Sequence, residues 1–114
     1  MITLYGIPNC DTVKKARTWL ETNQIEHTFH DFRKDGLTAE TVASWIEQKS
    51  WEVIINKRST SWRALPDDAK ANMDANLAIQ EAVKQPTLIK RPVLEGAGDL
   101  LVGFKEAEYS NHLS

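Results

Sequence analysis

The sequence predicts an α/β fold in which helices cover a mixed β-sheet. A short β-branched strand at the N-terminus is followed by a helical pattern, and this order of strand and helix is repeated before residue 50. A later apolar segment contains Arg91-Pro92 and is followed by a hairpin signal and a closing helix. This succession of elements is typical of a thioredoxin-like architecture. We therefore expect a three-layer α/β/α sandwich with a helical insertion over about residues 51–85.

The first half of the chain contains two strand–helix pairs. Residues 1–5 are apolar and β-branched, and residues 25–32 alternate between apolar and polar side chains, as half-buried strands do. Helices are expected over residues 11–22 and from Thr38 onward, where apolar residues return at helical spacing. Because the connections are short, we expect the two strands to pair in parallel with a right-handed crossover.

The insertion has a different character from the sequence before it. Residues 52–56 fit either a helix end or a short apolar stretch, and residues 57–63 form a polar, basic segment. Short helices are expected from Pro66 and over residues 76–83. The insertion is therefore expected to be a set of helices that ends at Gln85-Pro86.

The C-terminal segment is expected to form a hairpin and a helix. Proline is unfavourable in a central strand, so Arg91-Pro92 is expected in a tight turn, of the kind that can contain a cis peptide bond. Residues 95–99 are rich in glycine and predict a hairpin turn, after which residues 100–104 return antiparallel. A terminal helix is expected over residues 105–113.

Composition limits the possible classes of protein. The 114 residues predict a single domain over residues 1–114, long enough for a core without disulfides. A net charge of −2 argues against general binding to nucleic acid or to anionic membranes. One cysteine cannot form an intramolecular disulfide, and no apolar run approaches the length of a membrane span. We therefore expect a soluble, cytoplasmic, monomeric protein.

A metal site is not expected. The chain offers one cysteine and three scattered histidines, which do not form a ligand cluster at the spacing of known zinc sites. These histidines are His27, His30 and His112.

The candidate reactive residue is Cys10, the only cysteine of the chain. It follows Gly6-Ile7-Pro8-Asn9 and directly precedes the first predicted helix. The free N–H groups and the positive dipole end of a helix N-terminus stabilise a thiolate, so Cys10 is expected to ionise more readily than a free cysteine. Lys14 adds a positive charge one turn later, on nearly the same face.

Two other interpretations of Cys10 remain open. A lone cysteine in a small soluble protein is most often a buried, unreactive packing residue. The same helix N-terminus could also bind an anion without covalent chemistry. A thioredoxin-like layout would bring Arg91 close to Cys10, which favours a site over simple packing.

Three motifs of the chain resemble those of the ArsC/Spx family. They are Tyr5-Gly6-Ile7-Pro8-Asn9-Cys10-Asp11-Thr12-Val13-Lys14, Ile89-Lys90-Arg91-Pro92-Val93-Leu94 and Leu101-Val102-Gly103-Phe104. The resemblance covers nearly the whole chain. It implies a thioredoxin-like fold with a helical insertion, a nucleophilic cysteine at the first helix, and a cis peptide bond between the arginine and the proline.

The resemblance also implies roles for single residues. The nucleophile falls on Cys10, and substrate- or anion-binding residues fall on Thr12, Lys14 and Arg91. Pro92 is the structural proline of the site. A further family arginine falls on Arg58, with Arg63 as the competing position; from the residues alone, each of these two arginines reads as part of a solvated basic loop.

Two departures from the family pattern shape the functional expectation. Arsenate reductases of the family carry a third arginine near the last strand, where this chain has Gly103-Phe104, so arsenate reduction is the second hypothesis. Spx-type regulators carry Cys-x-x-Cys, whereas the fourth position here is Val13, so a non-catalytic regulator that binds a protein partner is the third.

The leading hypothesis is a glutathione-dependent thiol-disulfide reductase, because a site with one thiol must obtain its second thiol from outside. Glutathione is then a co-substrate rather than a tightly bound cofactor, and glutaredoxin is a further candidate partner. No metal is expected to take part.

Overall fold

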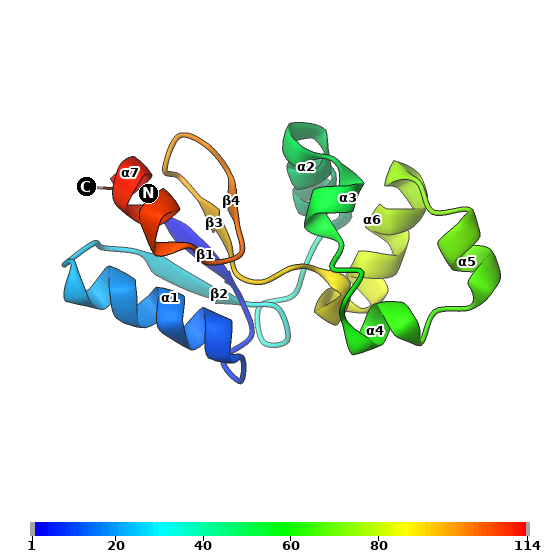
Figure 1. Cartoon of the computed structure of the whole chain (residues 1–114), viewed down its shortest axis with the longest axis horizontal. Coiled ribbons are helices and arrows are strands. Elements are labelled where there is room, and N and C mark those ends of the chain that lie inside the picture. The colour runs from blue at the N-terminus through cyan, green and yellow to red at the C-terminus, as the bar shows by residue number, and fades with distance from the viewer. Residues whose placement is uncertain (1, 114) are drawn as a thin grey trace. The chain divides into compact units, whose positions relative to one another are not determined.

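The computed structural model describes residues 2–113, and the chain divides into two compact units. The first unit comprises the residues up to Gly36 together with those from Arg91 onward, and the second spans Leu37–Lys90. Figure 1 shows the strands in the first unit and a series of helices in the second.

A four-stranded mixed sheet forms the centre of the first unit. Its strands are β1 (Thr3–Gly6), β2 (Thr28–Asp31), β3 (Val93–Glu95) and β4 (Leu101–Val102), in the spatial order β2-β1-β3-β4. β1 pairs in parallel with β2, as the short crossover through one helix predicts. β1 pairs antiparallel with β3, and β3 pairs antiparallel with β4.

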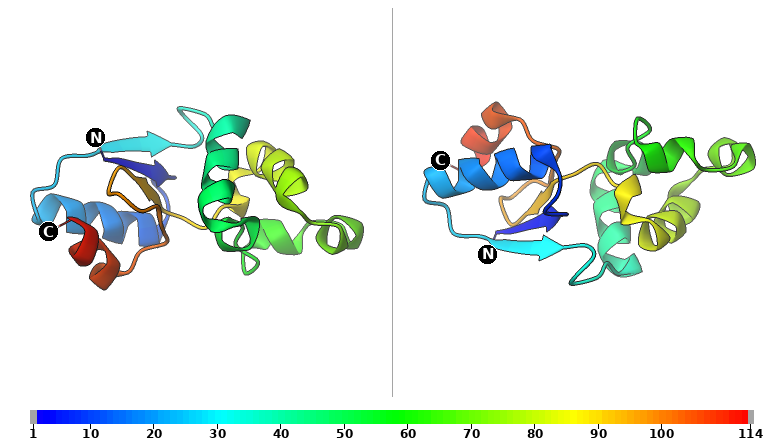
Figure 2. Two further views of the ribbon diagram at one scale, coloured as in Figure 1. Left: turned by 90° about the horizontal axis from the view of Figure 1, so that it is seen from above. Right: turned by 90° about the horizontal axis from the view of Figure 1, so that it is seen from below.

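Two helices, α1 (Asp11–Thr22) and α7 (Glu106–Leu113), cover one face of this sheet (Figure 2). Side chains that alternate along the strands meet the buried stripe of each helix there. The resulting core cluster consists of Leu4, Ala16, Leu20, Leu94, Leu101 and Tyr109, all at most 3% exposed. This packing fixes α1 on the sheet, and thereby fixes the residue at its N-terminus.

The second unit is helical. It contains α2 (Ala39–Lys49), α3 (Trp51–Ile54), α4 (Thr60–Arg63), α5 (Asp67–Ala71), α6 (Ala75–Lys84) and the 3₁₀ helix η1 (Pro86–Leu88). Three of the helices begin with a polar side chain that accepts a backbone N–H of the first turn: Thr38 for α2, Ser59 for α4 and Asp74 for α6. Buried apolar residues such as Trp45 and Ile54 form the core of this unit.

The structure confirms several predicted elements: the helix over residues 11–22, the C-terminal hairpin and the parallel pairing of β1 with β2. Other predictions were wrong in part. The alternating segment 25–32 forms a strand only at Thr28–Asp31, and the basic segment 57–63 contains the short helix α4. The sequence signal for α4 was the capping residue Ser59, whose Oγ accepts the N–H of Trp62 at 3.0 Å.

The predicted insertion lies inside the helical unit. Residues 51–85 fall within Leu37–Lys90, which also includes α2 and η1. The prediction that the chain is one domain, and the third layer of the predicted sandwich, remain predictions. Within residues 2–113 no helix combines the length and the apolar character needed to cross a bilayer.

Candidate functional site

The turn between β1 and α1 positions Cys10. Cys10 is the N-cap residue of α1, with extended backbone angles (φ −144°, ψ 122°), and its carbonyl accepts the N–H of Lys14 at 2.9 Å. Its side chain makes no capping hydrogen bond and is partly exposed. Cys10 therefore stands at the start of α1, where the N–H groups of the first helical turn are free, and its side chain is not sealed in the core.

Gly6 allows this turn to pack closely. A Cβ atom at position 6 would lie 2.8 Å from Cγ2 of Val13, which is shorter than real contacts of this kind. Val13 is fully buried in the first turn of α1. The absence of a side chain at Gly6 thus sets how near the helix that carries Cys10 approaches the end of β1.

Arg91 and Pro92 belong to the same end of the sheet as Cys10. In the antiparallel register Tyr5 pairs with Val93, so the residues that leave β1 and those that enter β3 lie at one edge. The Arg91-Pro92 peptide bond is cis, which confirms the expectation from the family resemblance. Pro92 is fully buried, and its carbonyl accepts the N–H of Gly103 at 2.8 Å.

The guanidinium of Arg91 has an unused donor. Its Nη1 atom is buried but makes no hydrogen bond to any described residue, whereas buried polar groups in proteins are almost always paired. A buried guanidinium N–H without a partner is a suitable donor for a carboxylate or another oxyanion. This observation distinguishes Arg91 from the exposed arginines of the chain.

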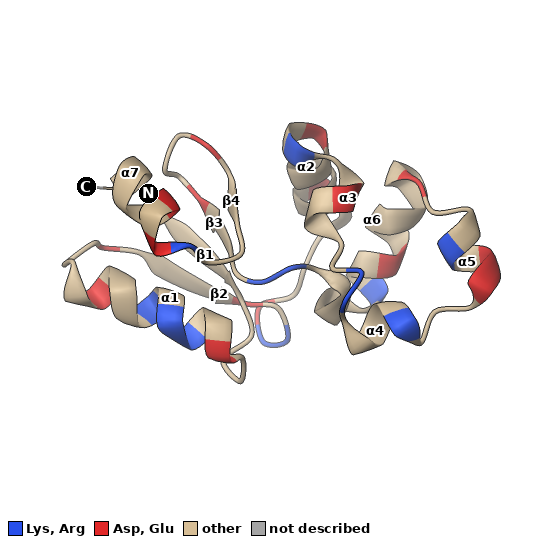
Figure 3. Ribbon diagram, in the orientation of Figure 1, with Lys and Arg blue, Asp and Glu red and all other residues tan. Residues whose placement is uncertain are grey.

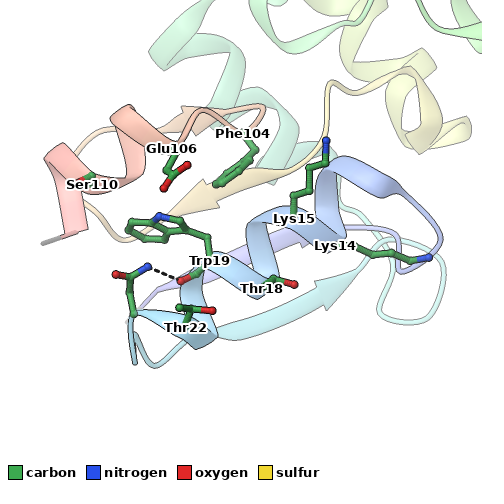
Figure 4. A pocket seen from close by; sticks show the side chains of 9 residues that line it. Lys14, Lys15, Thr18, Trp19, Thr22, Phe104, Glu106 and Ser110 are labelled. Carbon is green, nitrogen blue, oxygen red and sulfur yellow. Dashed lines mark hydrogen bonds between the residues drawn. The ribbon is translucent and has the colours of Figure 1, made fainter.

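Thr12 and Lys14 are exposed residues of the first turns of α1. Lys14 also lies at one end of an open groove of about 770 Å³, formed by α1 and by residues around α7. In Figure 4 Trp19 and Phe104 face each other across this groove, while Lys14 and Lys15 leave α1 in different directions. The side chain of Trp19 is partly buried, and its ring meets that of Tyr109 edge-on.

Charges near Cys10 are mixed. The first turn of α1 contains Asp11, whose carboxylate opposes a neighbouring thiolate, while Lys14 and Lys15 follow within the next turn. Figure 3 shows this alternation of acidic and basic residues along α1. The helix N-terminus, rather than a simple excess of positive side chains, is therefore the main electrostatic feature at Cys10.

Arg58 and Arg63 occupy different surroundings in the helical unit. Arg58 lines a pocket together with Asn56, Lys57 and Lys90. The backbone N–H of Arg58 donates to the side-chain oxygen of Asn56 at 3.0 Å. Arg63 ends α4, and its carbonyl accepts from the ammonium of Lys70. Lys90 is bonded to Arg91 in the chain, so Arg58 is the arginine that shares a pocket with the segment leading to Arg91. The meeting of Arg58 with Cys10 stays a prediction.

Tyr5 forms a separate polar contact on the sheet. Its hydroxyl donates to Oε1 of Glu95 at 2.8 Å, and its ring lies against His30 with centroids 4.7 Å apart. Burial, followed by the hydrogen bond to Glu95 and the charge of that carboxylate, raises the pKa of Tyr5 to about 12. Tyr5 is therefore a neutral hydroxyl donor at ordinary pH.

Among the described residues, no cluster of three or more histidine, cysteine, aspartate or glutamate side chains is arranged to hold a metal ion. The sequence analysis missed Lys90 as a neighbour of Arg58. The two residues are more than thirty positions apart and carry no local signal of proximity, which follows from the β-bridge between Ile55 and Ile89.

The chain resembles known proteins in both sequence and structure. The model of the ArsC family matches residues 5–112. An uncharacterised protein of Haemophilus influenzae is 49% identical over 109 residues, which cover 96% of each chain. The global transcriptional regulator Spx 1 of Bacillus cereus is 30% identical over 119 residues, which cover 99% of this chain and 87% of the regulator.

Solved structures resemble the whole chain. The YFFB protein matches with a TM-score of 0.96 and 41% identity over 100% of both chains. An arsenate reductase (ArsC) related protein from Brucella melitensis matches with a TM-score of 0.78 and 48% identity, covering 99% of this chain and 94% of that one. These neighbours show a thioredoxin-like fold.

Proposed function

Because the chain belongs to the ArsC family, we propose that it is a thiol-dependent oxidoreductase, and specifically a glutathione-dependent thiol-disulfide reductase with Cys10 as its nucleophile. One observation carries the proposal: the only cysteine of the chain is the partly exposed N-cap of α1, at the sheet edge where Arg91-Pro92 enters β3. With no second cysteine, an external thiol must complete the cycle.

The proposed reaction transfers a glutathionyl group twice. The Cys10 thiolate attacks the glutathione sulfur of a mixed disulfide, the S–S bond breaks, and the substrate leaves as a thiolate that takes up a proton. A second glutathione, as its thiolate, then attacks the glutathione sulfur bound to Cys10. Oxidised glutathione leaves and the Cys10 thiolate is restored, so the net reaction converts the mixed disulfide and one reduced glutathione into the reduced substrate and oxidised glutathione.

The remaining site residues would bind glutathione. Lys14, Arg58 and Arg91 are proposed to hold its two carboxylates, with the unpaired Nη1 of Arg91 as the donor that gains most from a ligand. Thr12 and the N–H groups at the start of α1 would steady the thiolate. Pro92 holds Arg91 in place through its burial. Glutaredoxin is an alternative reductant, and the cytoplasm, with its abundant glutathione, is the proposed location.

Turnover with a defined substrate tests this proposal. The substrate is the mixed disulfide of cysteine and glutathione, and formation of oxidised glutathione is followed by coupling to glutathione reductase and NADPH. We expect turnover that is abolished in Cys10→Ser and reduced about tenfold or more in Arg91→Ala, with Arg33→Ala, in an exposed turn, as the matched control. Equal rates for the wild type and Cys10→Ser would refute the proposal.

Arsenate reduction is the second candidate, favoured by the likeness to the Brucella melitensis arsenate reductase related protein. At the place of the family's third arginine this chain uses Phe104 for packing, with its ring edge-on to Tyr109 at 4.8 Å. An arsenate oxyanion would therefore have fewer convergent cations here. Arsenate-dependent oxidation of glutathione that is lost in Cys10→Ser and Arg91→Ala would favour this candidate over the first.

A non-catalytic regulator is the third candidate, favoured by the likeness to Spx 1. The position that carries the second cysteine of Cys-x-x-Cys is Val13, which is fully buried against Gly6. An intramolecular disulfide switch is thus unavailable to this chain. A cellular phenotype that survives Cys10→Ser, together with a stable protein partner, would favour regulation.

A further inference from the structure

A pocket of about 640 Å³ in the helical unit brings together three of that unit's basic residues. Its lining includes Lys57, Arg58 and Lys90, with Glu52 as its only acidic member, in a protein whose net charge is −2. Figure 3 shows basic residues in the loop between α3 and α4 and in the segment that leads to β3. The pocket is therefore a positive region on an acidic chain.

The two segments that carry these cations are held together by backbone bonds. Ile55 and Ile89 form an antiparallel β-bridge. The N–H of Asn56 donates to the carbonyl of Leu88 at 2.8 Å, and the N–H of Lys90 donates to the carbonyl of Ile54 at 2.8 Å. Because both isoleucines are buried, the spacing between residues 57–58 and residue 90 is fixed by the core of this unit.

The three cations are not equally engaged. Lys57 lies 5.0 Å from the ring centroid of Trp51 and 5.9 Å from that of Trp62, and its ammonium is 3.9 Å from Oε2 of Glu52. Arg58 and Lys90 are exposed and make no ion pair with a described residue. Two charges in the pocket are thus available to an external anion.

The pocket also has an apolar wall. Val53, at 43% exposure, is one of two large hydrophobic side chains that are exposed in the described chain, the other being Val83 on α6 at 36%. An inorganic anion gains nothing from contact with Val53, whereas a peptide that places an aliphatic side chain there buries apolar surface. The combination of cations and an apolar wall therefore favours a peptide over a simple ion.

We propose that this pocket is a docking surface for an acidic peptide segment of a partner protein, with carboxylates at Arg58 and Lys90 and an aliphatic side chain on Val53. Charge complementarity speeds the encounter and sets the orientation, and the apolar contact adds specificity. This docking involves the helical unit and requires no thiol chemistry. Arg58 also belongs to the proposed glutathione site, whereas Val53 and Lys90 do not, so substitutions at Val53 and Lys90 test the docking separately from the reductase proposal.

The test is an NMR titration of ¹⁵N-labelled full-length Cys10→Ser protein, which excludes disulfide formation. The probe is an acetylated, amidated peptide with leucine between two acidic residues on each side, and the comparison peptide has glycine in place of leucine. We expect shifts at residues 52–58 and 90 with a Kd of about 1 mM or below at low salt. We also expect binding to weaken about threefold to tenfold with the glycine peptide.

Matched variants locate the docking surface. Val53→Ala and Lys90→Ala are each expected to raise the Kd of the leucine peptide about threefold to tenfold. Val83→Ala and Lys84→Ala, on α6, are expected to leave this Kd unchanged. Three outcomes would overturn the proposal. The first is that the leucine peptide causes no chemical-shift change at the pocket residues, and the second is that both pocket variants bind it with unchanged affinity. The third is that the glycine peptide and inorganic phosphate cause the same chemical-shift changes at the same residues, which would indicate an adventitious anion site.

Discussion

Gly6 and Val13 lie in a contact that leaves no room for a side chain on Gly6. A Cβ at position 6 would come within 2.8 Å of Cγ2 and 3.4 Å of Cγ1 of Val13. Because Val13 is buried in the first turn of α1, this contact couples the end of β1 to the helix that begins after Cys10. The stability of the fold and the position of the thiol therefore depend on the same pair.

The substitution Gly6→Ala is expected to reduce the free energy of unfolding by about 1–3 kcal/mol, because the added methyl group overpacks the contact with Val13. Urea denaturation measures this loss. In the double variant with Val13→Ala, the combined loss should be smaller than the sum of the two single losses by about 0.5–3 kcal/mol. Strict additivity would show that the two residues do not constrain each other.

Tyr109 has a buried hydroxyl without a hydrogen-bond partner among the described residues, although its ring contacts Trp19 and Phe104 edge-on. Tyr109→Phe keeps the ring and removes the unsatisfied group, so we expect stability to stay the same or to rise by about 1 kcal/mol. Tyr109→Ala should instead cost about 3–5 kcal/mol through loss of the ring. A large loss on Tyr109→Phe would mean that the hydroxyl is satisfied in solution.

Alkaline pH is expected to destabilise the protein through Tyr5. Its pKa is raised from 10.0 to about 12 by burial and by the bond to Glu95, so between these values the folded state holds a proton that the unfolded state has lost. The stabilising contribution is complete below pH 10 and disappears as pH rises toward 12. The Tyr109 pKa is also raised, by burial and then by Glu108, and acts in the same direction.

Urea midpoints measured in steps from pH 9 to about pH 12 check this dependence. Tyr5→Phe should flatten part of the decline, and the part due to Tyr109 should remain. If the decline of Tyr5→Phe matched that of the wild type, Tyr5 would not be its source.

Glutathione affinity separates Arg58 from Arg63. If Arg58 holds a carboxylate of glutathione, Arg58→Ala should raise the KM for glutathione about tenfold, since a charge-assisted hydrogen bond contributes about 1.5–3 kcal/mol. Arg63 is the last residue of α4 and does not line the pocket of Arg58, so Arg63→Ala serves as the control and should leave the KM for glutathione unchanged. The opposite ranking would transfer the role to Arg63.

Local signals predicted much of the fold, including α2, α5 and α6 of the helical unit, but not the pairing of segments within that unit. The helix over residues 11–22 and the turn at Arg91-Pro92 were predictable because each has its own residue pattern, and the family resemblance added the cis bond. The β-bridge between Ile55 and Ile89 was not predictable, since its backbone hydrogen bonds join segments that are distant in sequence and carry no local pattern for the pairing. For the same reason the proximity of Arg58 to Lys90 was not predicted. The position of Cys10 at the start of a helix was predictable from the residues on either side of it in the sequence.

The proposed reductase activity requires the sulfur of Cys10 to be open and reactive in the folded protein. Intact-protein mass spectrometry after brief treatment of the native protein with oxidised glutathione tests it most directly. We expect one glutathionyl group per chain, which is absent in Cys10→Ser, is removed again by reduced glutathione, and is added several-fold more slowly in Arg91→Ala. A native protein that stays unmodified and reacts only after unfolding in urea would contradict it.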